Sequence, residues 1–280
     1  MVRRRSIEKY ETEVRLGLSE LFNLCRKNMS HSGDLLLCQQ NGFLFNDDPC
    51  VGPGEEGLNN LQNLNSISIK GVGEIVEDNK FFIEKKNTIF NGTTSFEKCL
   101  HQQKYTYLNI WENAYFLRTI TQLVNVLNGN NYDWKLVISD LPPSGKSKHI
   151  RKQIERLVPS PNFQRIVKEA YVGQIRNAIA HSQYHLVQGG ILYNNYGKDK
   201  YSTLQGLTFD EWERKYLYTY FILIGIFQIL KQILNELYVP ISKRTFSKGI
   251  PIKVPDKSNG FYEVCIYPNE TGDTWRFVKV

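Results

Sequence analysis

The residue types best suited to chemistry lie within one six-residue stretch, Arg176 to His181, of an otherwise apolar segment. Arg176 supplies a permanent cation, Asn177 a carboxamide, and His181 an imidazole. Charged side chains are seldom buried without partners, so an arginine and a histidine in an apolar segment need an explanation. A guanidinium stabilises phosphate charge and an imidazole transfers protons near neutral pH, which predicts chemistry on a phosphate group.

Helical periodicity predicts how these side chains are positioned. Residues four apart share a helix face, so Asn177 and His181 form a pair, with Gly173 one turn before and Tyr184 nearly one turn after. Arg176 lies roughly 140° round the helix from His181, at about 100° per residue. Either one side chain curls back, or the pair comes from two chains related by a two-fold axis.

The elements that must position this stretch are predicted to be mainly helical. Apolar residues recur at helical spacing over 6–29 and 96–128, and a basic helix over 147–157 follows Pro142 and Pro143. The motif helix should run from Pro161 to about Tyr184. The final helix should open at a capping box, Thr208 to Glu211, and end near Tyr238.

Strand signals are weaker and local. Two apolar runs around Gly189 and Gly190 predict a β-hairpin over 185–193, directly after the motif helix. Residues 31–95 are expected to form an irregular insertion, in which 66–72 and 80–84 are the strand candidates. The tail, 240–280, is expected to be β-rich. Its strand candidates are 250–254, 261–267 and 274–280.

The motif and its setting resemble those of the HEPN ribonucleases. Their signature is an arginine and a histidine separated by four to six residues, often with a polar residue after the arginine, as in Arg176-Asn177-Ala-Ile-Ala-His181. The resemblance covers about residues 96–239. It implies a single HEPN-like helical bundle over 1–280, with core helices at 6–29 and 96–239, that cleaves RNA without a metal ion or cofactor as a homodimer.

In the reaction that this resemblance implies, the ribose 2′-oxygen attacks the adjacent phosphorus. His181 suits removal of the 2′ proton or protonation of the leaving oxygen, and Arg176 suits the growing phosphorane charge. Asn177 would orient the imidazole or bind phosphate, and Tyr184 would stack on a base or donate a hydrogen bond. Further candidate RNA-binding residues are Glu112, Lys146, Lys148 and Arg151.

Two alternative roles remain open, and two further patterns in the sequence are weaker. Some HEPN domains bind RNA or nucleotides without cutting, and others pair with an antitoxin or regulatory partner. A membrane helix over 216–230 is disfavoured, because fifteen residues are fewer than the about 20 that a span needs. A second copy of the spacing, Arg26 to His31, has no asparagine directly after the arginine and lies where the first helix ends, so we interpret it as a decoy.

Bulk composition is consistent with a folded, basic, cytoplasmic protein. The net charge of +7 suits a polyanionic partner such as RNA. The five cysteines form no Cys-x-x-Cys pair, so neither a zinc site nor a disulfide framework is indicated. No apolar signal-peptide core follows the arginines at the N-terminus. By resemblance, such enzymes often act as prokaryotic toxins or in antiviral defence.

Overall fold

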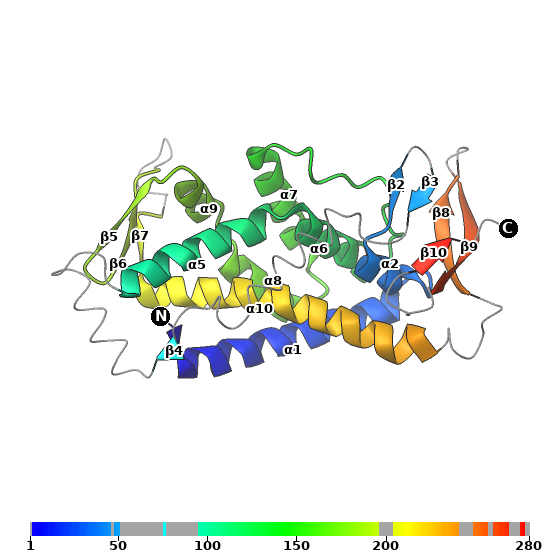
Figure 1. The fold of residues 1–280 in the computed structure, drawn as a ribbon, viewed down its shortest axis with the longest axis horizontal. Coiled ribbons are helices and arrows are strands. Elements are labelled where there is room, and N and C mark those ends of the chain that lie inside the picture. The colour runs from blue at the N-terminus through cyan, green and yellow to red at the C-terminus, as the bar shows by residue number, and fades with distance from the viewer. Residues whose placement is uncertain are drawn as a thin grey trace. The chain divides into compact units, whose positions relative to one another are not determined.

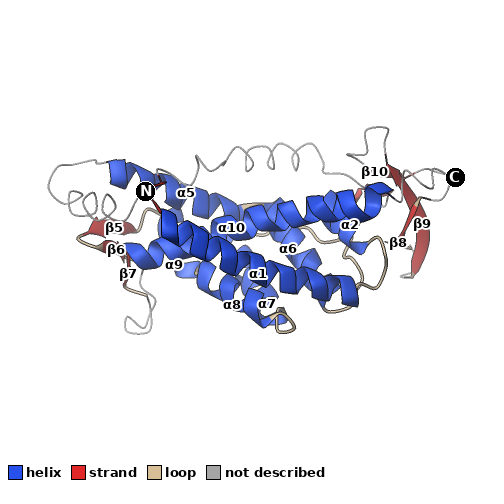
Figure 2. Ribbon diagram, turned by 90° about the horizontal axis from the view of Figure 1, so that it is seen from below, coloured by secondary structure: helices blue, strands red, loops and turns tan. Residues whose placement is uncertain are grey.

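The computed structural model describes residues 2–45, 48–50, 75–76, 95–195, 204–240, 249–256, 260–268 and 275–277. Over these ranges the chain is mainly helical, with small sheets, which confirms the predicted fold class at that level (Figures 1 and 2). The chain divides into two compact units. The first comprises Met1–Gly17, Gln62–Asn113 and Arg165–Leu223, and the second comprises Leu18–Leu61, Ala114–Gln164 and Ile224–Val280.

The first predicted helix is confirmed. Helix α1 (Arg4–Asn28) begins two residues earlier than expected, directly after strand β1 (Val2–Arg3). Strand β1 pairs in parallel with β4 (Ile75–Val76) in the first unit. The apolar stripe that predicted α1 is largely buried, as at Val14 and Leu18.

The expected helix over 96–128 is two helices, α5 (Ser95–Glu112) and α6 (Ala114–Leu127). The chain leaves helical geometry at Asn113, whose backbone N–H donates to the Ile110 carbonyl, three residues back, at 3.3 Å. A hydrogen bond between residues three apart, as in a 3₁₀-helix, tightens the last turn of α5. Asparagine side chains in addition compete with the helical backbone for hydrogen bonds. Apolar residues keep their helical spacing through Asn113, so the periodicity of the sequence does not reveal the break between the two helices.

The motif helix is also interrupted. Helix α8 (Pro161–Ala170) ends before an extended residue, Val172, and α9 (Gly173–Ala180) follows. Tyr107 of α5 satisfies the broken backbone: its hydroxyl donates to the Ala170 carbonyl at 3.0 Å and accepts from the Val172 N–H at 3.2 Å. The single helix predicted over 161–184 is therefore wrong, because a hydrogen bond from a distant helix stabilises the interruption.

The predicted hairpin is confirmed and extended. Strands β5 (Tyr184–Val187) and β6 (Gly190–Tyr193) pair antiparallel around Gly189, which has φ +88°, and β7 (Gly206–Thr208) pairs with β6. A Cβ on Gly190 would lie 2.2 Å from the Leu207 carbonyl oxygen, so this close pairing requires glycine.

The capping box at the start of helix α10 (Phe209–Ile233) is confirmed. The Glu211 carboxylate accepts from the Thr208 N–H at 2.8 Å, and the Thr208 hydroxyl accepts from the Glu211 N–H at 3.2 Å. Beyond α10 the chain continues as a π-helical stretch, Leu234–Tyr238. By length and composition Phe209–Tyr238 could cross a membrane, but 56% of its apolar window is buried, and a buried core helix meets the same criterion.

The second unit contains elements that the sequence did not predict well. Helix α2 (Asp34–Gln40) and the strand pair β2 (Phe43–Phe45) and β3 (Asp48–Cys50) lie in the stretch expected to be irregular. Helix α7 (Pro143–Arg156) begins four residues before the expected start, because proline is well accommodated in a first helical turn. The strand candidates 66–72 and 80–84 lie outside the described residues.

The β-rich tail is confirmed in its described part. Strands β8 (Ile250–Pro255), β9 (Phe261–Pro268) and β10 (Trp275–Phe277) form an antiparallel sheet with β9 in the middle. The Trp134 indole N–H donates to the Lys253 carbonyl at 2.8 Å, which ties this sheet to the loop after α6.

Candidate functional site

Arg176 lies in the interior of the first unit. The residue is 1% exposed, and its Nε lies 2.8 Å from Oε1 of Glu112 on α5. Its Nη1 donates to Asn177 Oδ1 at 2.8 Å. A buried guanidinium is tolerated only with such partners. The structure thus brings together Arg176, Asn177 and Glu112, which are three of the predicted site residues. The guanidinium of Arg176 is buried where it meets the other two side chains.

Asn177 and His181 form the exposed part of this cluster. Both side chains are exposed, as is Ala180 between them. The His181 N–H donates to the Asn177 carbonyl at 3.1 Å, so the two residues remain one helical turn apart. Their predicted pairing on one face is consistent with this geometry. Tyr184 is different: it already belongs to β5, and its predicted place on the helical stripe is wrong.

A C-terminal cap fixes the position of His181. The residue is the C-cap of α9, and Ser182 after it has the left-handed φ of 54°. The Ser182 N–H donates to the Ile179 carbonyl at 3.2 Å, and the Gln183 N–H donates to the Ala178 carbonyl at 2.8 Å. This pair of bonds is the Schellman motif, in which the left-handed residue is usually glycine.

The serine in this cap predicts a stabilising substitution. A left-handed conformation costs a residue with a Cβ roughly 1 kcal/mol or more, and glycine avoids that cost. We expect Ser182→Gly to raise the free energy of unfolding by about 0.5–1 kcal/mol in chemical denaturation. Ser182→Ala, which keeps the Cβ, is the control and should give no such gain. Equal stability of both variants would contradict the cap.

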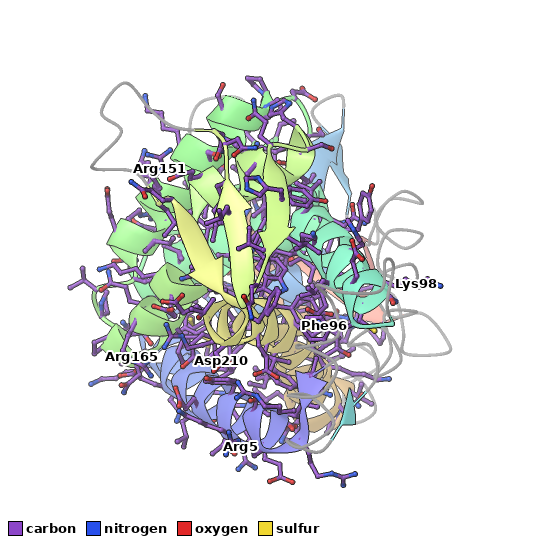
Figure 3. The ribbon with its side chains drawn as sticks, turned by 90° about the vertical axis from the view of Figure 1, so that its left-hand side faces the viewer. Arg5, Phe96, Lys98, Arg151, Arg165 and Asp210 are labelled. Carbon is purple, nitrogen blue, oxygen red and sulfur yellow. The ribbon has the colours of Figure 1, made fainter. Side chains whose placement is uncertain are left out.

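Helix α5 presents a polar face within this unit. Glu97, His101, Lys104 and Glu112 fall within about 80° of one another at 100° per residue. Phe96 and Lys98 show the other directions: Phe96 is buried against Phe209 with ring centroids 5.0 Å apart, whereas Lys98 points away into solvent (Figure 3). One face of α5 therefore carries carboxylates, an imidazole and an ammonium group, and this face is directed toward α9 and β5.

Tyr184 joins this polar face from β5. The Lys104 Nζ lies 3.8 Å from the centroid of the Tyr184 ring, a cation–π contact. The Tyr184 Oη lies 3.5 Å from His101 Nδ1, and His101 Nε2 lies 3.9 Å from Glu97 Oε1. Tyr184 is thus held from two sides, by an ammonium on its ring face and an imidazole at its hydroxyl.

Burial sets the protonation states in this cluster. It lowers the pKa of His101, an effect that the Lys104 charge increases, so the imidazole is neutral at pH 7. Burial raises the pKa of Tyr184, which keeps its hydroxyl as a donor. Burial lowers the pKa of Lys104 to about 8, so the amine remains mostly charged at pH 7.

Sequence reasoning missed His101 and Lys104. The spacing of His101 is not that of a metal ligand, so the sequence offers no reason to single it out as one. The available signal was the spacing of four and seven residues from Glu97, which places all three on one helical face. That signal has meaning only once α9 and β5 are known to pack against the same face.

The remaining predicted RNA-binding residues belong to the second unit. Lys146, Lys148 and Arg151 lie on α7, where Lys148 and Arg151 are exposed and Lys146 is half-buried. His31, the histidine of the second copy of the motif spacing, also belongs to the second unit. Its Nε2 lies 3.2 Å from Glu263 Oε1. Within the described ranges, no group of three or more His, Cys, Asp or Glu is arranged to hold a metal ion.

The first unit therefore combines an exposed imidazole, a carboxamide oriented by a buried cation, and a second cation beneath a tyrosine ring. Such groups can transfer protons and bind an anion without a metal ion. Comparison with known protein families, with curated proteins and with solved structures finds no match to this chain.

Proposed function

We propose that this protein is a metal-independent endoribonuclease of the HEPN type that acts as a homodimer. The observation that carries the proposal is the pairing of exposed His181 with exposed Asn177, whose side chain is fixed by buried Arg176. This cluster places a proton-transferring group and an oriented hydrogen-bond donor on one helical turn. Both are requirements of phosphodiester cleavage by a 2′-hydroxyl.

His181 would perform the proton transfers. The imidazole removes the proton from the ribose 2′-oxygen, or protonates the leaving 5′-oxygen, as the 2′-oxygen attacks phosphorus. The P–O5′ bond breaks, and the products are a 2′,3′-cyclic phosphate and a free 5′-hydroxyl. Two copies of His181 in a dimer would supply the base and the acid separately, which is the advantage of a composite site.

Arg176 would act through Asn177. Because the Arg176 Nη1 donates to the Asn177 Oδ1, the orientation of the Asn177 amide is fixed. The NH₂ group of the amide is therefore directed away from the guanidinium. Those N–H donors would then bind a non-bridging oxygen as phosphorane charge develops. In this protomer the guanidinium does not reach the surface, so a direct contact between Arg176 and phosphate stays a prediction.

Cleavage conditions and product ends test this function. Purified protein should cut single-stranded RNA in excess EDTA and leave 2′,3′-cyclic phosphate ends, and its mass in sedimentation should be that of a dimer. A DNA strand of the same sequence lacks the 2′-hydroxyl and should remain intact. Dependence on added Mg²⁺, or 3′-hydroxyl ends, would contradict the mechanism.

A second function is favoured by one observation, the burial of Arg176. If the Arg176 guanidinium stays buried and does not reach the phosphate, the site would bind RNA or a nucleotide and leave it uncut. In that case RNA is retained in a gel shift, with affinity that falls steeply as salt rises, and no product forms. Roles as a cytoplasmic toxin or defence effector, and an antitoxin or regulatory partner, are proposals that rest on the resemblance alone.

A further inference from the structure

Lys104 is buried in a way that the fold alone does not explain. The residue is 1% exposed, and its Nζ has no hydrogen-bond partner among the described residues. An ammonium group has three donors, and leaving them unsatisfied away from water costs stability. Buried lysines are normally paired with a carboxylate or with backbone carbonyls. This one lies against an aromatic ring.

The surroundings of Lys104 favour an anion as the missing partner. Its Nζ lies 3.8 Å from the Tyr184 ring centroid, and the neighbouring His101 is neutral at pH 7, so neither group cancels its charge. Glu97 is near enough to act on the ammonium electrostatically, yet makes no hydrogen bond to it. The Tyr184 hydroxyl is a second donor at the same place when the neutral His101 carries its proton on Nδ1 and donates it to the tyrosine oxygen.

The cluster also lies close to the proposed catalytic group. Tyr184 follows His181 by three residues, which span at most about 11 Å of extended chain. A phosphate that neighbours the cleaved one along the RNA would therefore come near Tyr184.

We propose that Lys104 and Tyr184 form a phosphate-binding subsite for the RNA strand, with His101 holding the tyrosine hydroxyl in place. This inference rests on the proposed function, because it takes the ligand to be the same RNA. The ammonium leaves the ring face of Tyr184 and donates to non-bridging oxygens of the phosphate. The side chain is flexible enough for this, with four carbons between the backbone and the charge.

RNA affinity tests the subsite. The background is His181→Ala, so that a fluorescent single-stranded RNA stays uncut during anisotropy measurements. Lys104→Met should weaken binding about tenfold, the effect of losing one charge-assisted contact. It should also reduce the slope of log affinity against log salt by about 0.7, as expected for one phosphate on a single strand.

Lys98→Met is the matched control. It removes an exposed lysine of the same helix that lies about 120° from Lys104 at 100° per residue, and affinity should change less than about twofold (Figure 3). Lys104→Met should in addition raise the denaturation midpoint, because an unpaired buried charge is replaced by an apolar side chain. A lowered midpoint would show that the ammonium has a structural partner, and it would overturn the proposal.

The outcomes separate the subsite from the proposed function. Equal affinity of the Lys104→Met and Lys98→Met proteins overturns the subsite, whether or not the wild-type protein cuts RNA in EDTA. Binding that depends on Lys104, in a wild-type protein that leaves RNA intact, supports the subsite and removes the nuclease function. Absence of RNA binding by the protein overturns both.

Discussion

Replacement of His181 by alanine is expected to lower the rate of RNA cleavage by at least about 10³-fold, with the fold and the dimer unchanged. General acid–base catalysis by one side chain contributes about 10²–10⁴-fold. In a composite site both copies of the imidazole are lost together, so the loss lies toward the upper end of that range. The measurement is the single-turnover cleavage rate of a defined RNA in EDTA.

The fold should tolerate this change. His181 is exposed, and the cap that positions it consists of backbone hydrogen bonds from Ser182 and Gln183, which do not involve the imidazole. The free energy of unfolding should therefore fall by less than about 0.5 kcal/mol. Circular dichroism and sedimentation then confirm that the loss of cleavage is chemical.

His185→Ala is the matched control. It removes another exposed imidazole from the same unit, four residues further along the chain, where His185 Nδ1 lies 3.3 Å from Asn194 Nδ2 in the hairpin. Its cleavage rate should stay within about twofold of the wild-type rate. If the His181→Ala protein cuts as fast as the His185→Ala protein, His181 is not the catalytic base or acid.

Local sequence signals predicted the elements that depend on local physics. The capping box at Thr208 and Glu211 was predictable because both hydrogen bonds join residues three apart. The hairpin at Gly189 was predictable because a positive φ at a two-residue turn favours glycine. These interactions form between near neighbours, so residue type and spacing are enough to recognise them.

The helix interruptions were not predictable for the opposite reason. The break at Val172 is stabilised by Tyr107, 65 residues earlier in the chain, and nothing local to 161–184 except Gly173 disfavours a continuous helix. Tertiary hydrogen bonds override helix propensity in such cases. The break determines where α9 begins and how it presents Arg176 to Glu112 on α5.

The candidate site was predicted in part. The motif spacing singled out Arg176, Asn177 and His181, and Glu112, a candidate RNA-binding residue, lies 2.8 Å from the Arg176 guanidinium. Burial was not predictable: periodicity does not say whether a guanidinium faces solvent or another helix. Lys104 and Tyr184 meet across elements 80 residues apart, so their cluster appears only in three dimensions.

The ion pair of Arg176 and Glu112 predicts the largest change in stability. Glu112→Ala removes the carboxylate 2.8 Å from the buried guanidinium, and we expect the free energy of unfolding to fall by about 3 kcal/mol. Arg176→Met replaces the cation by an apolar side chain and leaves only a half-buried carboxylate, so its cost should be about 1–2 kcal/mol. Chemical denaturation measures both.

The double variant isolates the pair. Once Arg176 is methionine, removal of Glu112 should cost little more, which gives a coupling energy of about 2 kcal/mol in the double-mutant cycle. Glu97→Ala is the control on the same helix: its side chain is 26% exposed against 27% for Glu112, and it lies 3.9 Å from the imidazole Nε2 of His101 rather than 2.8 Å from a guanidinium. That change should cost less than about 1 kcal/mol.

A second double-mutant cycle, on Arg176 and Asn177, tests how the cation contributes to the proposed cleavage. If Arg176 acts by orienting Asn177, then Asn177→Ala and Arg176→Met should slow cleavage by similar factors, and the double variant should be no slower than either. A guanidinium that leaves Glu112 to contact the phosphate would instead make the two effects multiply. A cost for Glu112→Ala no larger than that for Glu97→Ala would contradict the buried pair on which the orientation of Asn177 depends.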